Sequence, residues 1–286
     1  MNVITAVSSK GGVTKTTLVS NLSALLADSG YRVLAIDADN TQPALSSHYP
    51  IVEQAPHGLI KLIKDRCLGP EVISKTSIDG LDIVVSDDRS DTLSEYILHE
   101  ADGRYRIRQA LTTIREEDRY DFVMIDTRGA KGAVLDAAML ATDIFLAPVS
   151  PDIMSAKEFY RGTVERYREI KESAKFLNIL LGPLHVLFSR VDRTVDAKDV
   201  ADSFRAMTEG QPDIRLLETQ VPTSTVYKAA ASAQMPVHLY EPTSNTKRAS
   251  ARDTMMSVLE ELFAIHNEYD NLFQVPEISP RDGDAK

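Results

Sequence analysis

The segment from Ser8 to Thr17, SSKGGVTKTT, constrains the fold of this chain more than any other part of its sequence. An apolar, β-branched run precedes it over residues 2–7, and leucines at helical spacing follow it over residues 16–28, before Gly30. This order predicts a buried strand, a glycine loop and a helix that stops near Gly30. The loop N–H groups and the helix N-terminus would then point to one place, which favours a bound phosphate.

The loop departs from the ordinary phosphate-loop pattern at both of its glycines, because Ser9 and Thr14 stand in those places. It also carries a second lysine, Lys10, five residues before Lys15. A loop with two lysines indicates a subclass of nucleotide-binding proteins that complete the site by pairing with a second copy.

The end of the loop, Lys15-Thr16-Thr17, has the residue types that a nucleotide phosphate needs. Lys15 is predicted to contact the β- and γ-phosphates, and the Thr16 hydroxyl is predicted to bind Mg²⁺. Thr17 is predicted to lie near the α-phosphate. The alternative, a Gly-Gly turn with solvated lysines, does not explain the flanking strand and helix.

Two later apolar runs end in aspartate. Residues 31–36 lead into Asp37-Ala38-Asp39, and residues 120–125 lead into Asp126. Because the carboxyl ends of parallel strands form the ligand crevice, Asp37 is expected close to the phosphates, where it can hold a water or a metal-bound water. Asp126 is expected to support Mg²⁺. In isolation, acidic residues at strand exits are common and need no function.

In the loop from Lys10 to Thr17 and in the strand ends at Asp37–Asp39 and Asp126, the chain resembles the deviant Walker ATPases of the ParA/MinD family. The resemblance extends over roughly residues 1–265. It implies ATP and Mg²⁺ as cofactors, with ATP held between two subunits of a homodimer.

The resemblance also implies roles for individual residues. The catalytic residues would be Lys10, which reaches the partner's phosphates, Lys15, and Asp37, which positions the hydrolytic water. The implied nucleotide-binding residues are Lys10, Gly11, Gly12, Val13, Thr14, Lys15, Thr16, Thr17, Asp126, Ser189 and Pro222. The implied metal-binding residues are Thr16, Asp37 and Asp126.

Three positions depart from the family pattern. Thr14 stands where relatives commonly have glycine, so a positive φ there would strain its backbone. Arg128 stands where many relatives have proline, and it could stabilise phosphate charge or face the dimer surface. Ser189 stands where relatives often carry an asparagine for the adenine.

Strand-like and helix-like runs alternate along the chain, which predicts an α/β fold with a doubly wound, mostly parallel sheet and helices on both faces. We expect one ATPase domain over residues 1–267 and a flexible, acidic tail over 268–286. Residues 72–78 and 81–85, joined by Asp79-Gly80, predict an extra edge hairpin.

A single cysteine, Cys67, excludes an internal disulfide and indicates a reducing compartment. It also excludes the nitrogenase iron proteins, which share the deviant loop but need several cluster cysteines. The sequence shows no secretory signal and no long apolar stretch, so we expect a cytoplasmic protein, associated with the nucleoid if it binds DNA.

Two kinds of partner remain open. The prolines and acids after residue 273 make a poor lipid-binding helix, so no membrane attachment is expected. The net charge of −10 opposes DNA binding, but local basic patches can still bind it. The candidate patches are Arg104, Arg106 and Arg108; Arg161, Arg166 and Arg168; Arg190 and Arg193; and Lys247, Arg248 and Arg252.

The resemblance therefore predicts a slow, partner-stimulated ATPase whose ATP-dependent dimer binds DNA non-specifically and partitions plasmid, chromosomal or mobile-element DNA. A separate centromere-binding, ParB-like protein would stimulate hydrolysis. The alternative is an ATPase that positions a conjugation, secretion or division apparatus. A metabolic kinase or ligase is disfavoured, because such enzymes usually have the ordinary loop without Lys10.

Overall fold

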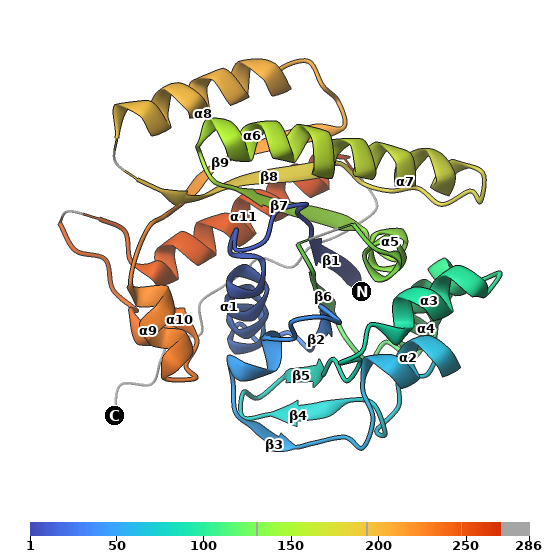
Figure 1. Ribbon diagram of the computed structural model, residues 1–286. Helices are drawn as coiled ribbons and strands as arrows, with labels where there is room; N and C mark the ends of the chain where they lie inside the picture. The colour runs from blue at the N-terminus through green and yellow to red at the C-terminus, as the bar shows by residue number, and fades with distance from the viewer. Residues whose placement is uncertain (130, 193, 247, 270–286) are drawn as a thin grey trace, which may run out of the picture.

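A computed structural model describes residues 1–129, 131–192, 194–246 and 248–269. Nine strands within these residues form one sheet in the order β3-β4-β5-β2-β6-β1-β7-β8-β9 (Figure 1). Only the β3–β4 and β4–β5 pairs of this sheet are antiparallel. The strands are β1 (Asn2–Ala6), β2 (Val33–Ala38), β3 (Ile51–Glu53), β4 (Ser74–Thr76), β5 (Leu81–Val84), β6 (Phe122–Thr127), β7 (Ile144–Val149), β8 (Leu184–Val191) and β9 (Ile214–Pro222).

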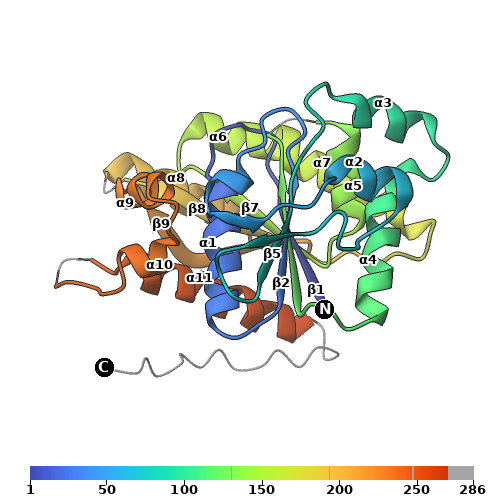
Figure 2. The same cartoon turned by 90° about the horizontal axis from the view of Figure 1, so that it is seen from below.

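Helices cover both faces of the sheet (Figure 2). The short 3-10 segments are η1 (Leu45–Ser47) and η2 (Gly103–Tyr105), and η3 (Phe159–Val164) is a π-helix. The α-helices are α1 (Lys15–Asp28), α2 (Leu59–Asp65), α3 (Thr92–His99), α4 (Arg106–Glu116), α5 (Ala133–Leu140), α6 (Ile153–Glu158), α7 (Glu165–Lys175), α8 (Val195–Thr208), α9 (Val226–Ser232), α10 (Val237–Tyr240) and α11 (Ala251–Tyr269).

The central strands are buried on both faces, which explains why they read as continuous apolar runs. Along β2, Val33 and Ala35 enter the core beneath α1 and α11, whereas Leu34 and Ile36 enter the core beneath α2, α4 and α5. Successive side chains of a strand point to opposite faces, so both layers of helices need apolar partners. The predicted doubly wound, mostly parallel α/β fold is confirmed.

The predicted edge hairpin is confirmed, because β4 pairs antiparallel to β5 through the turn at Gly80, whose φ is +79°. The short strand β3, which extends this edge, had no clear signal in the sequence. Residues 91–117, an amphipathic stretch that the sequence alone would give as one helix, are divided into α3, η2 and α4. Gly103 marks the division, since a Cβ there would lie 2.1 Å from the carbonyl oxygen of Ile97.

The domain boundary expected at residue 267 falls inside the last turn of α11, which ends at Tyr269. The rest of the predicted tail, 270–286, lies outside the described residues. Among the helices of the described part, none is both long enough and apolar enough to cross a membrane.

Candidate nucleotide-binding site

The loop between β1 and α1 adopts the conformation in which Thr14 is strained. Gly12 and Thr14 both have φ near +72°, a region that a β-branched side chain rarely enters. The Thr14 hydroxyl lies 2.6 Å from the Ser189 hydroxyl at the end of β8 and also contacts the Val13 carbonyl. These two contacts hold Thr14 in a position that glycine would occupy without strain.

Lys15 begins α1 and turns its ammonium group back across the loop. Its Nζ donates a hydrogen bond to the carbonyl oxygen of Lys10 at 3.2 Å. The side chain is buried, and this burial lowers the pKa of Lys15, while the charges of Asp126 and Asp39 act in the opposite direction. A cation held above glycine-loop N–H groups is suited to a phosphate ligand.

Thr16 and Asp126 meet at the base of the loop, as the predicted metal site requires. The Thr16 hydroxyl donates to Asp126 Oδ2 at 2.6 Å. Burial, which is complete, raises the pKa of Asp126 to about 6. Its Oδ1 is buried and has no hydrogen-bond partner among the described residues.

This unpartnered carboxylate oxygen is the observation that fits a divalent cation. Mg²⁺ prefers oxygen ligands and usually keeps several waters, so one carboxylate and one hydroxyl are an ordinary protein contribution to its site. When bound, the ion would offset the charge that burial makes costly at Asp126.

Asp37 lies beside Asp126 on the neighbouring strand, since the two residues are register partners in the β2–β6 pair. Asp37 is fully buried, and its carboxylate accepts the N–H groups of Asp39 at 3.2 Å and Leu45 at 3.1 Å. Burial, and secondly the charge of Asp126, raises the pKa of Asp37 well above its usual range. Asp39, by contrast, lines the open cavity beside the loop. The water-positioning role expected of Asp37 thus stays a prediction, and the geometry gives Asp39 the better access to a water.

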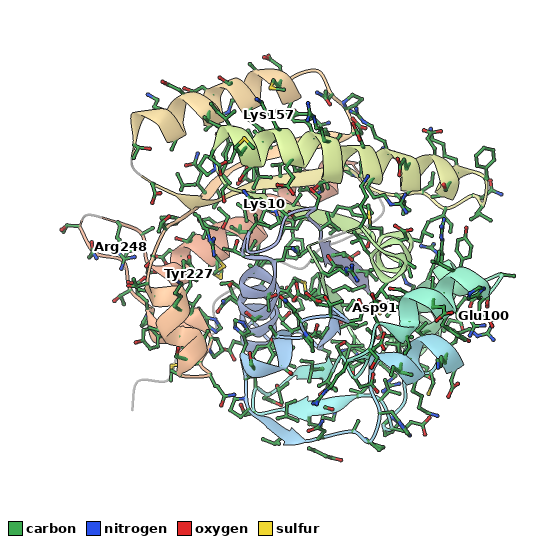
Figure 3. All side chains as sticks on the ribbon, viewed as in Figure 1. Lys10, Asp91, Glu100, Lys157, Tyr227 and Arg248 are labelled. Carbon is green, nitrogen blue, oxygen red and sulfur yellow. The ribbon has the colours of Figure 1, made fainter. Side chains whose placement is uncertain are left out.

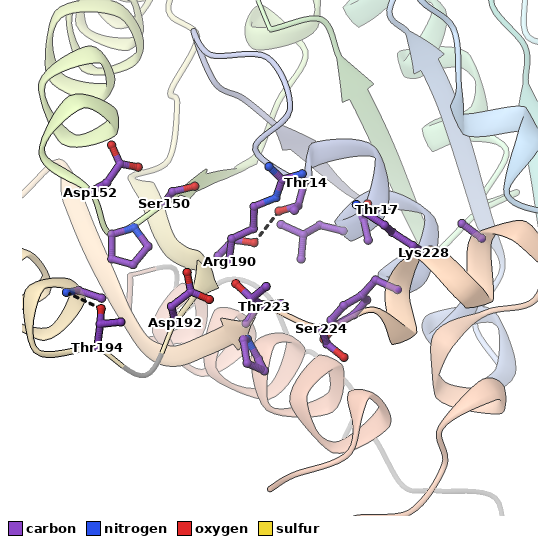
Figure 4. A pocket seen from close by; sticks show the side chains of 18 of the residues that line it. Thr14, Thr17, Ser150, Asp152, Arg190, Asp192, Thr194, Thr223, Ser224 and Lys228 are labelled. Atoms are coloured by element: carbon purple, nitrogen blue, oxygen red, sulfur yellow. Dashed lines mark hydrogen bonds between the residues drawn. The ribbon is translucent and has the colours of Figure 1, made fainter.

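Two adjoining cavities surround the loop. The smaller one, about 460 Å³, is lined by Gly11, Gly12, Lys15 and Thr16, and by Thr14, Thr17 and Arg190, which it shares with the larger cavity. Figure 4 shows the larger one, about 740 Å³. Its wall also contains Ser189 and Pro222. Val13 is buried behind the loop. Because the two cavities share three lining residues they lie side by side, and this arrangement would suit the phosphates of a nucleotide in the smaller cavity and its ribose and base in the larger one.

Lys10 belongs to the loop but is absent from the described lining of both the smaller cavity, which we call the phosphate cavity, and the larger one. Its Nζ donates to Ser155 Oγ at 2.8 Å, on the first turn of α6 (Figure 3 labels Lys10). Asp152, the N-cap of this helix, accepts from the Ser155 N–H at 2.8 Å and from the Ser155 hydroxyl at 2.5 Å. Lys10 is therefore held toward α6, outside its own subunit's phosphate cavity.

The π-helical segment η3 supports the other side of the loop. The Thr163 hydroxyl accepts the Ser9 N–H at 2.9 Å, and the Ser9 hydroxyl donates to the carbonyl oxygen of Glu158 at 3.2 Å. Gly162 allows this approach, because a Cβ there would lie 2.2 Å from Ser9 Oγ. Ser9 stands where the ordinary pattern has glycine, and its side chain and backbone join the loop to α6 and η3.

The fold brings to these cavities three residues that sequence reasoning did not place there, and one of them, Arg190, was predicted instead as part of a DNA-binding patch. Asp152 and Arg190 line the larger cavity, and Arg190 has a positive φ of 58° at the end of β8. Tyr227 lines it from α9. A Ser-Pro-Asp segment after a strand signals a helix cap, but no local pattern connects positions so far apart along the chain.

The comparisons with known proteins agree with this geometry. A family model described as an AAA domain matches residues 1–179. The cell division protein PomZ of Myxococcus xanthus is 28% identical over 236 residues, which cover 82% of this chain and 71% of PomZ. The chromosome partitioning protein ParA of Caulobacter vibrioides is 28% identical over 243 residues, covering 84% of this chain and 88% of ParA.

Among solved structures, apo McdA of Cyanothece superposes with a TM-score of 0.71 at 24% identity, over 94% of this chain and 98% of McdA. At this identity the likeness shows a shared fold. The two-lysine loop, the Thr16–Asp126 pair and the family match over most of the chain lead to one assignment: the chain belongs to the ParA/MinD family of P-loop ATPases.

Proposed function

We propose that this chain is an ATP-dependent switch, in which bound ATP and Mg²⁺ join two copies into a homodimer and hydrolysis separates them. The position of Lys10 is the single observation that carries this proposal. Lys10 belongs to the phosphate loop by sequence, yet its ammonium group lies on α6 at Ser155, outside the phosphate cavity of its own subunit. A lysine placed there does not serve the phosphates of its own subunit, and it can reach those of a second subunit once it leaves Ser155.

Each residue of the site has a distinct part in this proposal. Lys15 holds the β- and γ-phosphates, and Thr16 and Asp126 hold Mg²⁺, which neutralises charge that develops on the phosphates during transfer. Asp39 holds the attacking water from the cavity wall, while the buried Asp37 keeps the end of β2 in place through its bonds to Asp39 and Leu45. Ser189 and Pro222 bound the space for the base.

For the cargo, we propose DNA that is bound non-specifically by the closed dimer, as in partition systems. The structure excludes several of the predicted basic residues as DNA contacts. Arg106 is buried and paired with Asp102 and Glu100, both at 2.9 Å, so it is not available to a phosphate backbone. Arg166 and Arg168 are likewise paired, with Asp136 and Asp213 respectively.

Exposed cations remain on α6 and η3, where the side chains of Lys157 and Arg161 are both exposed. Figure 3 labels Lys157. We propose these two side chains as DNA contacts. Replacing both with alanine should weaken DNA binding and reduce the salt slope of log K by about two, one for each lost phosphate contact. Arg115→Ala, which removes an exposed arginine paired with Asp143, is the matched control.

A second candidate is the positioning of a protein machine rather than DNA. The neutralised arginines and the net charge of −10 favour it, and the cell division protein PomZ is as similar in sequence as ParA, at 28% identity each. The stimulating partner in either case would be a separate protein, ParB-like for partition.

A gel shift on non-specific DNA distinguishes the two candidates. The protein is mixed with DNA and ATP, ADP or no nucleotide in parallel lanes, and retarded migration of the DNA in the ATP lane alone supports partition. If the DNA migrates equally in every lane, although sedimentation shows that the protein is dimeric with ATP, the result supports positioning. Lys15→Ala should bind no nucleotide, and normal ATP hydrolysis by that variant would contradict the site itself.

A further inference from the structure

Arg128 follows the strand end at Asp126 and Thr127, and its backbone is fixed against the phosphate loop. The next residue, Gly129, packs so closely that a Cβ there would lie 2.7 Å from both Cα and N of Gly11. Arg128 itself lines the 460 Å³ phosphate cavity. The residue is therefore placed by the loop contact, independently of what its side chain binds.

The side chain of Arg128 rests on a weak partner. Its Nη1 lies 3.4 Å from Asp91 Oδ2, a single long contact at the N-terminus of α3, and the Asp91 side chain is 41% exposed. Arg166, by comparison, binds Asp136 through two of its nitrogens, one of them at 2.8 Å. The Arg128 side chain is 20% exposed, and a single, partly exposed pair at this distance contributes about 0–1 kcal/mol, so its exchange costs little.

Asp91 has other donors that remain if Arg128 leaves. Ser94 and the buried Asn40 donate to Asp91 Oδ1 (Figure 3 labels Asp91). The Ser94 hydroxyl, then Asn40, and after them Arg128 hold the pKa of Asp91 below its usual range. Asp91 thus stays ionised at neutral pH without the arginine.

The phosphate cavity has a need for a further cation. Lys10 lies on Ser155, so Lys15 and Arg190 are the other basic side chains in the described lining of the cavity, and Arg190 lies at its border with the larger cavity. A triphosphate carries more negative charge than these two cations neutralise. The guanidinium of arginine matches phosphate oxygens with two parallel N–H groups and is always charged.

We propose that Arg128 is a phosphate-binding residue of this site, which exchanges Asp91 for the terminal phosphate when ATP binds. This inference rests on the proposed function, because it assumes that the cavity holds ATP. The exchange gives one subunit a cis-acting cation before the dimer closes. It also frees Asp91 of its contact with Arg128, while Asp91 continues to join the N-terminus of α3 to Asn40, which follows β2.

Calorimetric titration of a non-hydrolysable ATP analogue and of ADP tests the exchange. All variants carry Lys10→Ala, so that dimer formation does not contribute. Arg128→Ala should weaken binding of the analogue by about tenfold or more, as expected for a charge-assisted hydrogen bond, while ADP affinity changes by less than about twofold. Arg128→Lys should recover part of the loss.

Asp91→Asn should change the affinity for the analogue in the opposite direction. It weakens the resting contact, so analogue affinity should rise by up to about fivefold with ADP affinity unchanged. Arg115→Ala is the matched control for a paired surface arginine and should change neither affinity. Melting temperatures without nucleotide show that each variant is folded.

Two results would overturn the role of Arg128: equal affinities of Arg128→Ala and its parent for the analogue, or equal weakening of analogue and ADP. Failure of the proposed function looks different. In that case the parent protein binds neither nucleotide, or Lys15→Ala binds both as well as the parent does.

Discussion

The Lys10 ammonium group donates to Ser155 Oγ at 2.8 Å, although 145 residues separate the two along the chain. The Ser155 hydroxyl in turn donates a hydrogen bond to Asp152, so Lys10 is bound to a fixed partner on α6. This contact must break before Lys10 can reach a second subunit.

Removing the hydrogen bond between Lys10 and Ser155 should favour the ATP-dependent dimer. Ser155→Ala deletes the acceptor of Lys10, and hydrogen bonds to charged groups contribute about 1.5–3 kcal/mol at most. We therefore expect a several-fold rise in the ATP-dependent dimer fraction, measured by sedimentation at a fixed protein concentration. Lys10→Ala should bind nucleotide but stay monomeric. If Lys10→Ala sediments like its parent with ATP, Lys10 does not act across subunits.

Gly162→Ala should damage the nucleotide site from the far side of the loop. Alanine normally stabilises a helix relative to glycine by about 1 kcal/mol, but here the added Cβ would lie 2.3 Å from Ser9 Cβ. We expect a loss of about 1–3 kcal/mol in unfolding free energy, as for other overpacked sites, together with weaker nucleotide binding.

Gly69→Ala is the matched control, because its nearest contact would be Cys67 Sγ at an ordinary 3.6 Å. Combining Gly162→Ala with Ser9→Gly removes the clashing atoms and should restore part of the loss. If the change in unfolding free energy of the double variant equals the sum of the changes in the two single variants, the Gly162–Ser9 contact is not the cause.

Buried carboxylates should make the nucleotide-free protein less stable as the pH rises. The pKa of Asp126 is raised from its ordinary 3.8 to about 6, so the folded protein holds a proton that the unfolded chain has lost. Stability from this group is then present below about pH 4 and declines until about pH 6.

Asp126→Asn keeps an acceptor for Thr16 and removes the charge. Without nucleotide or Mg²⁺, it should stabilise the protein by about 1–3 kcal/mol at pH 7.5 and by almost nothing at pH 4. Thermal melts at both pH values measure the difference, with the exposed Asp79→Asn as control. A gain of equal size at both values would exclude titration of Asp126 as the cause.

Thr14 offers a test of backbone strain at φ 72°. Thr14→Gly removes the strain, of order 1–3 kcal/mol, and also the bond to Ser189, of about 1 kcal/mol. Thr14→Ala removes the same bond and leaves most of the strain. We expect the glycine variant to melt at or above the parent temperature and the alanine variant below it. The reverse order would show that the hydroxyl contact outweighs the strain.

Much of this site could be read from short stretches of sequence. The apolar run before Ser8, the glycines at 11 and 12 and the leucines after Thr16 lie within one strand–loop–helix unit. The aspartates at 37 and 126 follow strands whose carboxyl ends meet at one sheet edge, so their proximity also followed from the predicted parallel pairing. The same patterns did not separate α3 from α4, because the close approach of Gly103 to Ile97 depends on how two helices pack.

The sequence by itself determined the doubly wound fold, the phosphate loop and the acidic strand ends, because each depends on residue types within a short window. Tertiary structure alone decided that Lys10 rests on Ser155 and that Asp39, rather than Asp37, lines the cavity. It also decided that Arg106 is neutralised by carboxylates. Burial and charge pairing depend on which distant segments meet, and the order of residues along the chain does not contain those distances.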